Sequence, residues 1–290
     1  MNRLTAWLGV AGAILVGLSV ALAGGDGGSR WGALPVFAWC VVIAYAMQWL
    51  AFVPAWLSRS EHFFDLTGST TYLTVLVVAL LASGAVDLRS GLLAAFVAVW
   101  AVRLGLFLFL RIRRTGADRR FDRLKARLPA FLMTWTLQGA WVSLACAPAL
   151  AAITSPAAAP GLDGWLLAGA ALWLAGFAIE VLADEQKRRF RMRPENAERF
   201  IDTGLWAWCR HPNYLGEILL WCGVALAAAP ALQGWQLATL LSPLLIGLQL
   251  TFVSGIPLLD ARAKKRWGED AAYRRYRERT PMLLPLPPRR

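Results

Sequence analysis

Histidine and cysteine are both scarce in this chain, whose 290 residues include 2 His and 4 Cys. No two cysteines stand in a CxxC spacing, so the common cysteine-based zinc and redox motifs are excluded. Neither a GxGxxG nor a GxxxxGK[ST] stretch is present, and the sequence therefore indicates no soluble nucleotide-binding fold. These absences argue against a zinc site and against a soluble nucleotide-binding fold.

Charge is also missing from long stretches of the chain. Hydrophobic residues make up 58% of the sequence, and the mean hydropathy is +0.49. A helix that crosses a bilayer needs about 20 apolar residues. We predict an all-α, polytopic transmembrane helix bundle with eight spans, which are Leu4–Gly25, Trp31–Ser58, Leu66–Val86, Ser90–Leu110, Phe131–Ala152, Gly164–Ala183 and two within Ile218–Leu259 that turn near Pro230.

The basic residues gather on one side of this predicted bundle. Most lie in Arg111–Arg127, Lys187–Arg210 and Ala261–Arg290, whereas the alternate connections carry almost none. The positive-inside rule therefore places both termini in the cytoplasm. The net charge of +12 suits anionic lipid or an anionic cofactor. Nucleic acid is not an expected partner, because the basic residues flank membrane helices throughout.

The first apolar run has two interpretations. Arg3 and the small-residue end Ala21-Leu22-Ala23 resemble a cleaved signal peptide. Its length and the lack of a polar cleavage region favour a retained anchor. We predict an N-terminal anchor helix in residues 1–30 and a transmembrane domain in 31–290, with a cytoplasmic cofactor-binding part over about 180–290.

The segment Arg210–Glu217, Arg-His-Pro-Asn-Tyr-Leu-Gly-Glu, joins a basic loop to an apolar run. Pro212 suits the first turn of a helix, where its missing N–H costs nothing. The start of that helix directs its free N–H groups and positive dipole end at the loop, which favours an anion. Glu217 lies one turn inside the predicted membrane helix. The alternative is that Arg210 and His211 are interfacial anchors.

Three further stretches carry polar groups. Glu180, Asp184, Lys187, Arg188 and Arg191 share one helical face, either as a site or as a stop-transfer cluster with salt bridges. Arg103 can snorkel to the interface or pair with a phosphate. The tail Tyr273–Thr280 can close a pocket or lie on the membrane surface. Together they suggest a polar pocket facing the cytoplasm, formed by the fourth, sixth and seventh helices.

A fourth polar stretch, Phe63–Tyr72, opens the third predicted helix with several hydroxyl groups. Asp65 can cap this helix. Tyr72, further in, can form a hydrogen bond to a neighbouring helix.

Three elements together resemble the steroid 5-alpha reductase superfamily, in particular its bacterial membrane branch: Gly204-Leu205-Trp206, the Arg210–Glu217 segment, and Tyr276 nine residues before Pro285. Sterol reductases share the Arg-His-Pro-Asn-Tyr-Leu-Gly motif, and isoprenylcysteine carboxyl methyltransferases share a looser form. The resemblance implies a seven-helix core, here with an extra N-terminal helix. It also implies an enzyme of the bacterial inner membrane that uses NADPH to reduce a carbon–carbon double bond conjugated to a ketone, in a steroid or other lipid arriving from the bilayer. We expect this enzyme to be a monomer.

By this resemblance, the expected cofactor contacts are Arg103, Glu180, Asp184, Arg188, Arg191, Arg199, Arg210, His211, Asn213, Tyr214, Glu217 and Tyr276. The superfamily also uses a carboxylate or amide and a tyrosine to hydrogen-bond the ketone. The acidic position falls near Asp65, and the tyrosine position falls near Trp100, which cannot donate a proton in this role. Tyr72 is the nearest replacement. Gln48, on the second predicted helix, is a further polar candidate, but the parity of the helices argues against it.

Two other classes of function stay open. An S-adenosylmethionine-dependent methyltransferase would also use the Arg-His-Pro motif. A non-catalytic lipid-binding or transport protein would leave the polar residues as anchors. The acidic-then-basic helix Glu180–Arg191, together with Asn213 and Glu217, favours NADPH over S-adenosylmethionine.

Overall fold

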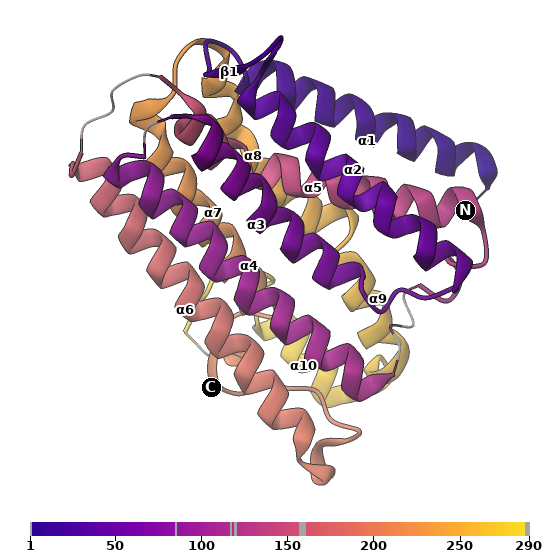
Figure 1. The fold of residues 1–290 in the computed structure, drawn as a ribbon. Coiled ribbons are helices and arrows are strands. Elements are labelled where there is room, and N and C mark those ends of the chain that lie inside the picture. Colours follow the sequence, from indigo (N-terminus) through magenta and orange to yellow (C-terminus); the bar gives the residue numbers. More distant parts are fainter. Residues whose placement is uncertain (1, 85, 117, 119–120, 157–160, 288–290) are drawn as a thin grey trace. The chain divides into compact units, whose positions relative to one another are not determined.

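A computed structural model describes residues 2–84, 86–116, 118, 121–156 and 161–287 (Figure 1). Within these residues, eight helical segments are long and apolar enough to cross a membrane, as predicted. The chain is therefore an all-α, polytopic integral membrane protein. The spans are built on α1 (Arg3–Gly24), α2 (Val36–Leu57), α3 (Phe64–Ala82), α4 (Leu88–Thr115), α5 (Leu128–Thr154), α6 (Gly164–Met192), α7 (Pro212–Ala228) and α8 (Ser242–Leu248) with its continuation.

The chain divides into two compact units. The first unit contains Met1–Leu167 and Val224–Ser242, and the second contains Ala168–Gly223 and Pro243–Arg290. Helices α6 and α7 each contribute to both units, because each crosses a boundary between them. The only strands in the described residues are the short antiparallel pair β1 (Arg30–Trp31) and β2 (Leu34–Pro35), which lie between α1 and α2.

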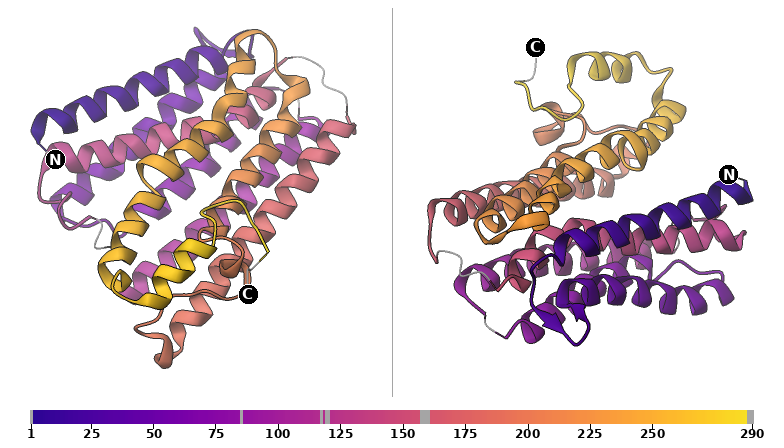
Figure 2. Two further views of the ribbon diagram at one scale, coloured as in Figure 1. Left: turned by 180° about the vertical axis from the view of Figure 1, so that it is seen from behind. Right: turned by 90° about the horizontal axis from the view of Figure 1, so that it is seen from above.

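In the first unit, α1 lies along α2 and α5, as Figures 1 and 2 both show. Its buried face consists of small side chains, among them Ala6, Ala13 and Gly17. Small residues allow helix backbones to approach closely where water supplies no driving force. The Tyr45 hydroxyl of α2 donates a hydrogen bond to the carbonyl oxygen of Ala13. These contacts make α1 part of the packed bundle.

In the second unit, α6 and α7 are in glycine-mediated contact. A methyl group at Gly216 would lie 2.6 Å from the backbone nitrogen of Glu180 and from the carbonyl oxygen of Gly176. A methyl group at Gly223 would lie 2.5 Å from the backbone nitrogen of Trp173. The two backbones therefore touch, which leaves no room for larger residues at these positions.

The long last apolar run turns where the sequence predicts. After α7 come the short 3-10 helices η3 (Ala229–Ala231) and η4 (Gly234–Leu241), and then α8. A π-helical turn, η5 (Gln249–Val253), separates α8 from α9 (Ile256–Trp267), and α10 (Ala271–Arg279) follows. Such π-turns are rare and recur at functional sites. Here the turn introduces the helix that carries Asp260.

Candidate functional site

The carboxylate of Asp260, on α9, gathers three basic side chains in the second unit. Its Oδ2 lies 3.4 Å from Arg210 Nη1 and 3.2 Å from Arg277 Nη2. Its Oδ1 lies 3.5 Å from His211 Nε2. Residues from the loop before α7, from α9 and from α10 therefore meet at the N-terminal end of α7, and we call Arg210, His211, Asp260 and Arg277 the Asp260 cluster.

Several polar atoms in and beside this cluster are buried and make no hydrogen bond within the described residues. They are Arg210 Nε, both ring nitrogens of His211 and Asn213 Oδ1. His211 is only 5% exposed, and its ring stacks on that of Tyr214 at 5.8 Å between centroids. An unsatisfied buried polar group costs free energy, about 1–3 kcal/mol each. The cluster thus offers hydrogen-bonding capacity that the protein itself does not use.

His211 is neutral in these surroundings. Burial lowers its pKa to about 4, and although Asp260 opposes this shift, the positive charges of Lys187 and Arg210 add to it. The cluster therefore carries two guanidinium groups against one carboxylate near neutral pH. An anion placed here would meet a net positive charge and the positive end of the α7 dipole.

Hydrogen bonds to backbone carbonyl oxygens hold the loop that precedes α7 in place. In the 3-10 helix η2 (Gly204–Ala207), Trp206 donates its indole N–H to the carbonyl oxygen of Ala183 on α6, at 3.0 Å. The Tyr276 hydroxyl donates to the carbonyl oxygen of Trp206 at 2.7 Å. The Arg210 N–H donates to Pro281, and the Leu286 N–H donates to Trp208. The C-terminal tail is thereby hydrogen-bonded to the loop that precedes α7.

The predicted face of α6 is only partly directed at this cluster. Arg188 forms a bidentate contact with Glu185 at 2.6 and 2.7 Å, so the expected salt-bridge alternative describes this arginine well. Glu180 is 4% exposed at the contact with α7, and Asp184 is half-buried. Two of the predicted cofactor residues are exposed, Arg191 on α6 and Arg199 beyond the 3-10 helix η1 (Pro194–Asn196), and Glu217 is half-buried on α7.

The predicted catalytic residues and Arg103 belong to the first unit. Tyr72 is buried on α3, and its ring packs edge-on against Trp100 at 5.2 Å between centroids. Asp65 does not cap α3, because Phe63 occupies the cap position, and its carboxylate lies 3.9 Å from Arg111. The capping alternative for Asp65 is therefore wrong. The Arg103 guanidinium lies 5.2 Å from the ring centre of Phe107 on the same helix.

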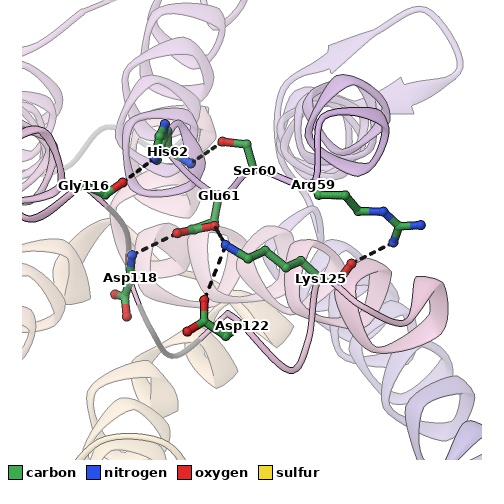
Figure 3. A network of polar contacts seen from close by, with 8 residues as sticks. All are labelled: Arg59, Ser60, Glu61, His62, Gly116, Asp118, Asp122 and Lys125. Carbon is green, nitrogen blue, oxygen red and sulfur yellow. Dashed lines mark hydrogen bonds and ion pairs between the residues drawn. The ribbon is translucent and has the colours of Figure 1, made fainter.

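Two loops beside Asp65 are joined by a polar network, shown in Figure 3. Glu61, only 3% exposed, accepts hydrogen bonds from Lys125 Nζ at 2.7 Å and from the Asp118 N–H at 2.9 Å. His62 Nε2 lies 2.6 Å from the Gly116 carbonyl oxygen. Burial alone would raise the pKa of Glu61, but the bonds from Lys125 and Asp118 outweigh it and lower this pKa. The network fastens the start of α3 to the connection between α4 and α5.

The sequence analysis missed Asp260, which is the centre of the cluster. A usable signal was present, since Asp260 is the first charge after the apolar run Ile256-Pro257-Leu258-Leu259. An acid at this edge of a membrane span has the same significance as Glu217. The structure brings Arg210, His211 and Tyr276 into one neighbourhood, as predicted, and it adds Asp260 and Arg277.

Comparison with known proteins identifies a family for the chain and several relatives of known name. Residues 51–280 match a family model described as "Protein of unknown function (DUF1295)". The chain is 38% identical over 81 residues to "3-oxo-5-alpha-steroid 4-dehydrogenase 1" of Bos taurus, a match that covers 26% of this chain and 31% of the relative. The proteins of that name from Mus musculus and Homo sapiens are 40% identical over 68 residues and 35% identical over 71 residues. These two matches cover 23% of this chain in each case, and 26% and 27% of the relatives.

The alignment thus spans less than a third of these relatives' length, whereas the family model spans most of the chain. No solved structure matches the chain significantly. The expected resemblance to the steroid 5-alpha reductase superfamily is confirmed.

Proposed function

The chain belongs to the DUF1295 family of steroid 5-alpha reductase-like membrane proteins, and from that premise we propose that it is an NADPH-dependent reductase. Its substrate would be a steroid or another lipid that carries a carbon–carbon double bond conjugated to a ketone. We propose that it works as a monomer in a bacterial inner membrane, with both termini in the cytoplasm, and that its substrate arrives from the bilayer.

The Asp260 cluster is the observation that carries the proposal. Two guanidinium groups and a buried histidine stand at the N-terminal end of α7, and Arg210 Nε and both His211 nitrogens have no hydrogen-bond partner among the residues that the structure describes. These groups fit the phosphates of a dinucleotide, because arginine donates in a fork that matches phosphate oxygens. Arg210, His211 and Arg277 would hold the phosphates, and Asn213 Oδ1 would accept from a hydroxyl or amide.

The remaining predicted contacts extend this cofactor site. Tyr214 stacks on His211, and Tyr276 donates a hydrogen bond to Trp206 in the loop that precedes α7. Both tyrosines would line the nucleotide. Asp184, Arg188, Arg191 and Arg199 would bind it from the end of α6, and Glu180, Glu217 and Arg103 complete the set proposed from the superfamily resemblance. These roles rest on the resemblance, and each can be tested by substitution.

The bound cofactor would supply the hydride, and the chain's own residues would stabilise the negative charge that develops on the ketone oxygen. Donors aimed at such an oxygen are among the largest contributors to catalysis. We assign the donor role to Tyr72, whose phenol is buried on α3, and a supporting role to Asp65. In a water-poor site a hydrogen bond from this phenol to the developing oxyanion is electrostatically stronger than it would be in water.

Cofactor binding to the detergent-purified protein tests this function. The chain has 15 Trp, so energy transfer from tryptophan to bound NADPH reports binding directly. We expect saturable binding of NADPH, weaker binding of NADH and no competition from S-adenosylmethionine. Arg210→Met should weaken NADPH binding by about 10- to 100-fold, the effect of losing a charge-assisted contact worth roughly 1.5–3 kcal/mol.

Arg262→Met is the matched control, because Arg262 is an exposed arginine on α9 and its loss removes the same charge. Equal weakening in both variants would mean that general electrostatic attraction holds the nucleotide. Binding of S-adenosylmethionine instead of NADPH would overturn the reductase and direct the search to methyl acceptors.

Turnover tests the proposed proton donor separately. With NADPH binding intact, Tyr72→Phe should reduce the rate of NADPH oxidation by an enone lipid about 10²- to 10⁴-fold, the usual contribution of a general acid. Unchanged turnover in this variant would remove Tyr72 from the mechanism.

A further inference from the structure

The Asp260 carboxylate and an anionic ligand would require the same donors. Arg210 Nη1, Arg277 Nη2 and His211 Nε2 all lie within 3.5 Å of this one side chain. A carboxylate and a phosphate present the same kind of acceptor oxygens to a guanidinium group. Both therefore cannot be fully bound by these three side chains at once.

The contacts to Asp260 are long. Charge-assisted hydrogen bonds between nitrogen and a carboxylate are typically about 2.7–2.9 Å. Arg188 reaches this range on Glu185 within the same unit, at 2.6 and 2.7 Å, whereas the three contacts to Asp260 measure 3.2–3.5 Å. The Asp260 carboxylate thus neutralises the cluster without saturating its donors.

Arg210 and His211 also have polar atoms that could form further hydrogen bonds. Arg210 Nε and both nitrogens of His211 are buried and make no hydrogen bond within the described residues. A phosphate group, with several oxygens, can accept from Arg210 Nε and from the single N–H of the neutral His211 in addition to the guanidinium groups, which is more than one carboxylate can do. The exchange of Asp260 for a phosphate would then be favourable overall, although it requires breaking the existing ion pairs.

Asp260 is placed where such an exchange is easy. It lies on α9, which begins after the π-turn Gln249–Val253 and Gly255 rather than continuing α8. Its side chain is 22% exposed, so water can take over its hydration when the arginines leave.

We propose that Asp260 is an internal competitor for the phosphates of the cofactor, which holds Arg210, His211 and Arg277 until a phosphate displaces it. This inference rests on the proposed function and concerns the regulation of its cofactor site. Asp260 is a positioning residue in this role, because it touches the phosphate-binding side chains and not the phosphate. Its carboxylate weakens cofactor affinity and keeps the arginines in place between binding events.

Asp260→Asn is the decisive variant, since it keeps the size of the side chain and removes its charge. We expect NADPH to bind about five- to tenfold more tightly than to the native chain, as measured by energy transfer from tryptophan. Inorganic pyrophosphate, followed by titration calorimetry, should gain a similar factor. Tighter binding of both ligands supports competition by Asp260.

Glu269→Gln is the matched control, because it also removes one negative charge, from an exposed residue that follows α9. It should change either affinity by less than about twofold, since exposed charges are screened by salt. Asp260→Glu keeps the charge and should retain native affinity or weaken it. Circular dichroism confirms that each variant keeps its helices before binding is compared.

Weaker binding of pyrophosphate by Asp260→Asn would overturn the inference, because Asp260 would then align the arginines for the ligand. An equal gain in Glu269→Gln would overturn it as well. If the native chain binds no NADPH, the proposed function fails, and the pyrophosphate titration still decides the inference. If neither the native chain nor Asp260→Asn binds pyrophosphate, competition between Asp260 and an anion is refuted.

Discussion

Two pairs of charges in the first unit and the Asp260 cluster of the second unit are arranged in different ways. In the first unit, Glu61 and Lys125 meet at 2.7 Å, and Arg89 and Asp163 meet at 2.9 Å. In the second unit, the Asp260 cluster has longer contacts, and some of its polar atoms have no hydrogen-bond partner in the described part of the chain. Short, paired charges fix loops, whereas loosely neutralised cations remain able to bind a ligand. The comparison indicates which polar residues serve the fold and which are available for function.

Removal of Lys125 should produce the largest loss of stability. Lys125→Met leaves the carboxylate of Glu61 buried without its cation, which costs about 3 kcal/mol. Thermal unfolding in detergent measures the loss. The low pKa of Glu61 makes its contribution largest above its ordinary value of 4.5, and the contribution disappears as pH falls through the pKa of the folded state. The difference between native and variant should therefore shrink in acid.

Asp122→Asn is the control for this comparison. Asp122 is 54% exposed and lies 3.5 Å from Lys125, so its loss should cost less than about 0.5 kcal/mol. Equal losses in the two variants would contradict the view that Glu61–Lys125 is the pair that fixes the loops.

The pH dependence of stability should reveal the neutral His211 of the second unit. Its pKa falls to about 4 on folding from an ordinary value of 6.5, so the unfolded chain binds the proton more readily. Stability is complete above pH 6.5 and decreases as pH falls toward 4, by about 3 kcal/mol in all. Unfolding midpoints of native protein and His211→Gln, measured across this range, isolate the contribution. Parallel curves would show that His211 does not titrate as described.

Close packing of α6 on α7 should also be sensitive to one methyl group. Gly216→Ala places a carbon 2.6 Å from the backbone of Glu180, and separating two helix backbones typically costs about 1–3 kcal/mol. Gly12→Ala on α1 is the control, since nothing lies within 4 Å of an added methyl group there. Thermal unfolding compares the two. If Gly216→Ala unfolds at the same temperature as the native chain, the two helices can separate without a cost in stability.

The smallest expected effect concerns the hydrogen bond that joins α1 to α2. Tyr45→Phe removes the donor to Ala13 and should cost about 0.6 kcal/mol, the usual value for a hydrogen bond between membrane helices. Unfolding in detergent measures this cost. A loss as large as that of Lys125→Met would show that neutral contacts stabilise the first unit as strongly as its ion pairs.

The helices could be predicted from the sequence because the required property is local. Each span needs only an uninterrupted apolar run of sufficient length, and the structure contains all eight. The break after α7 was also readable, since Pro230 and Gly234 mark it. The start of α7 at Pro212 follows from the fixed φ of proline. The division into an anchor and a core domain stays a prediction.

The partners of the charged groups could not be predicted in the same way. Asp65 was expected either to cap a helix or to donate in catalysis, yet its carboxylate lies near Arg111, 46 positions away along the chain by residue number. Glu61 and Lys125 are 64 positions apart, and Arg210 and Asp260 are 50 apart. A charge is readable from one residue, but its counter-ion depends on which helices become neighbours.

The sequence by itself determined that this protein is a helical membrane protein, and its Arg210–Glu217 motif predicted an anion-binding helix start. Both follow from hydrophobic length and from local backbone chemistry, which need no distant contacts. Only the tertiary structure decided that Asp260 shares the cations of that motif and that Glu61 is buried against Lys125. These pairings depend on loops and helices that meet after folding, when burial makes a single well-placed carboxylate matter.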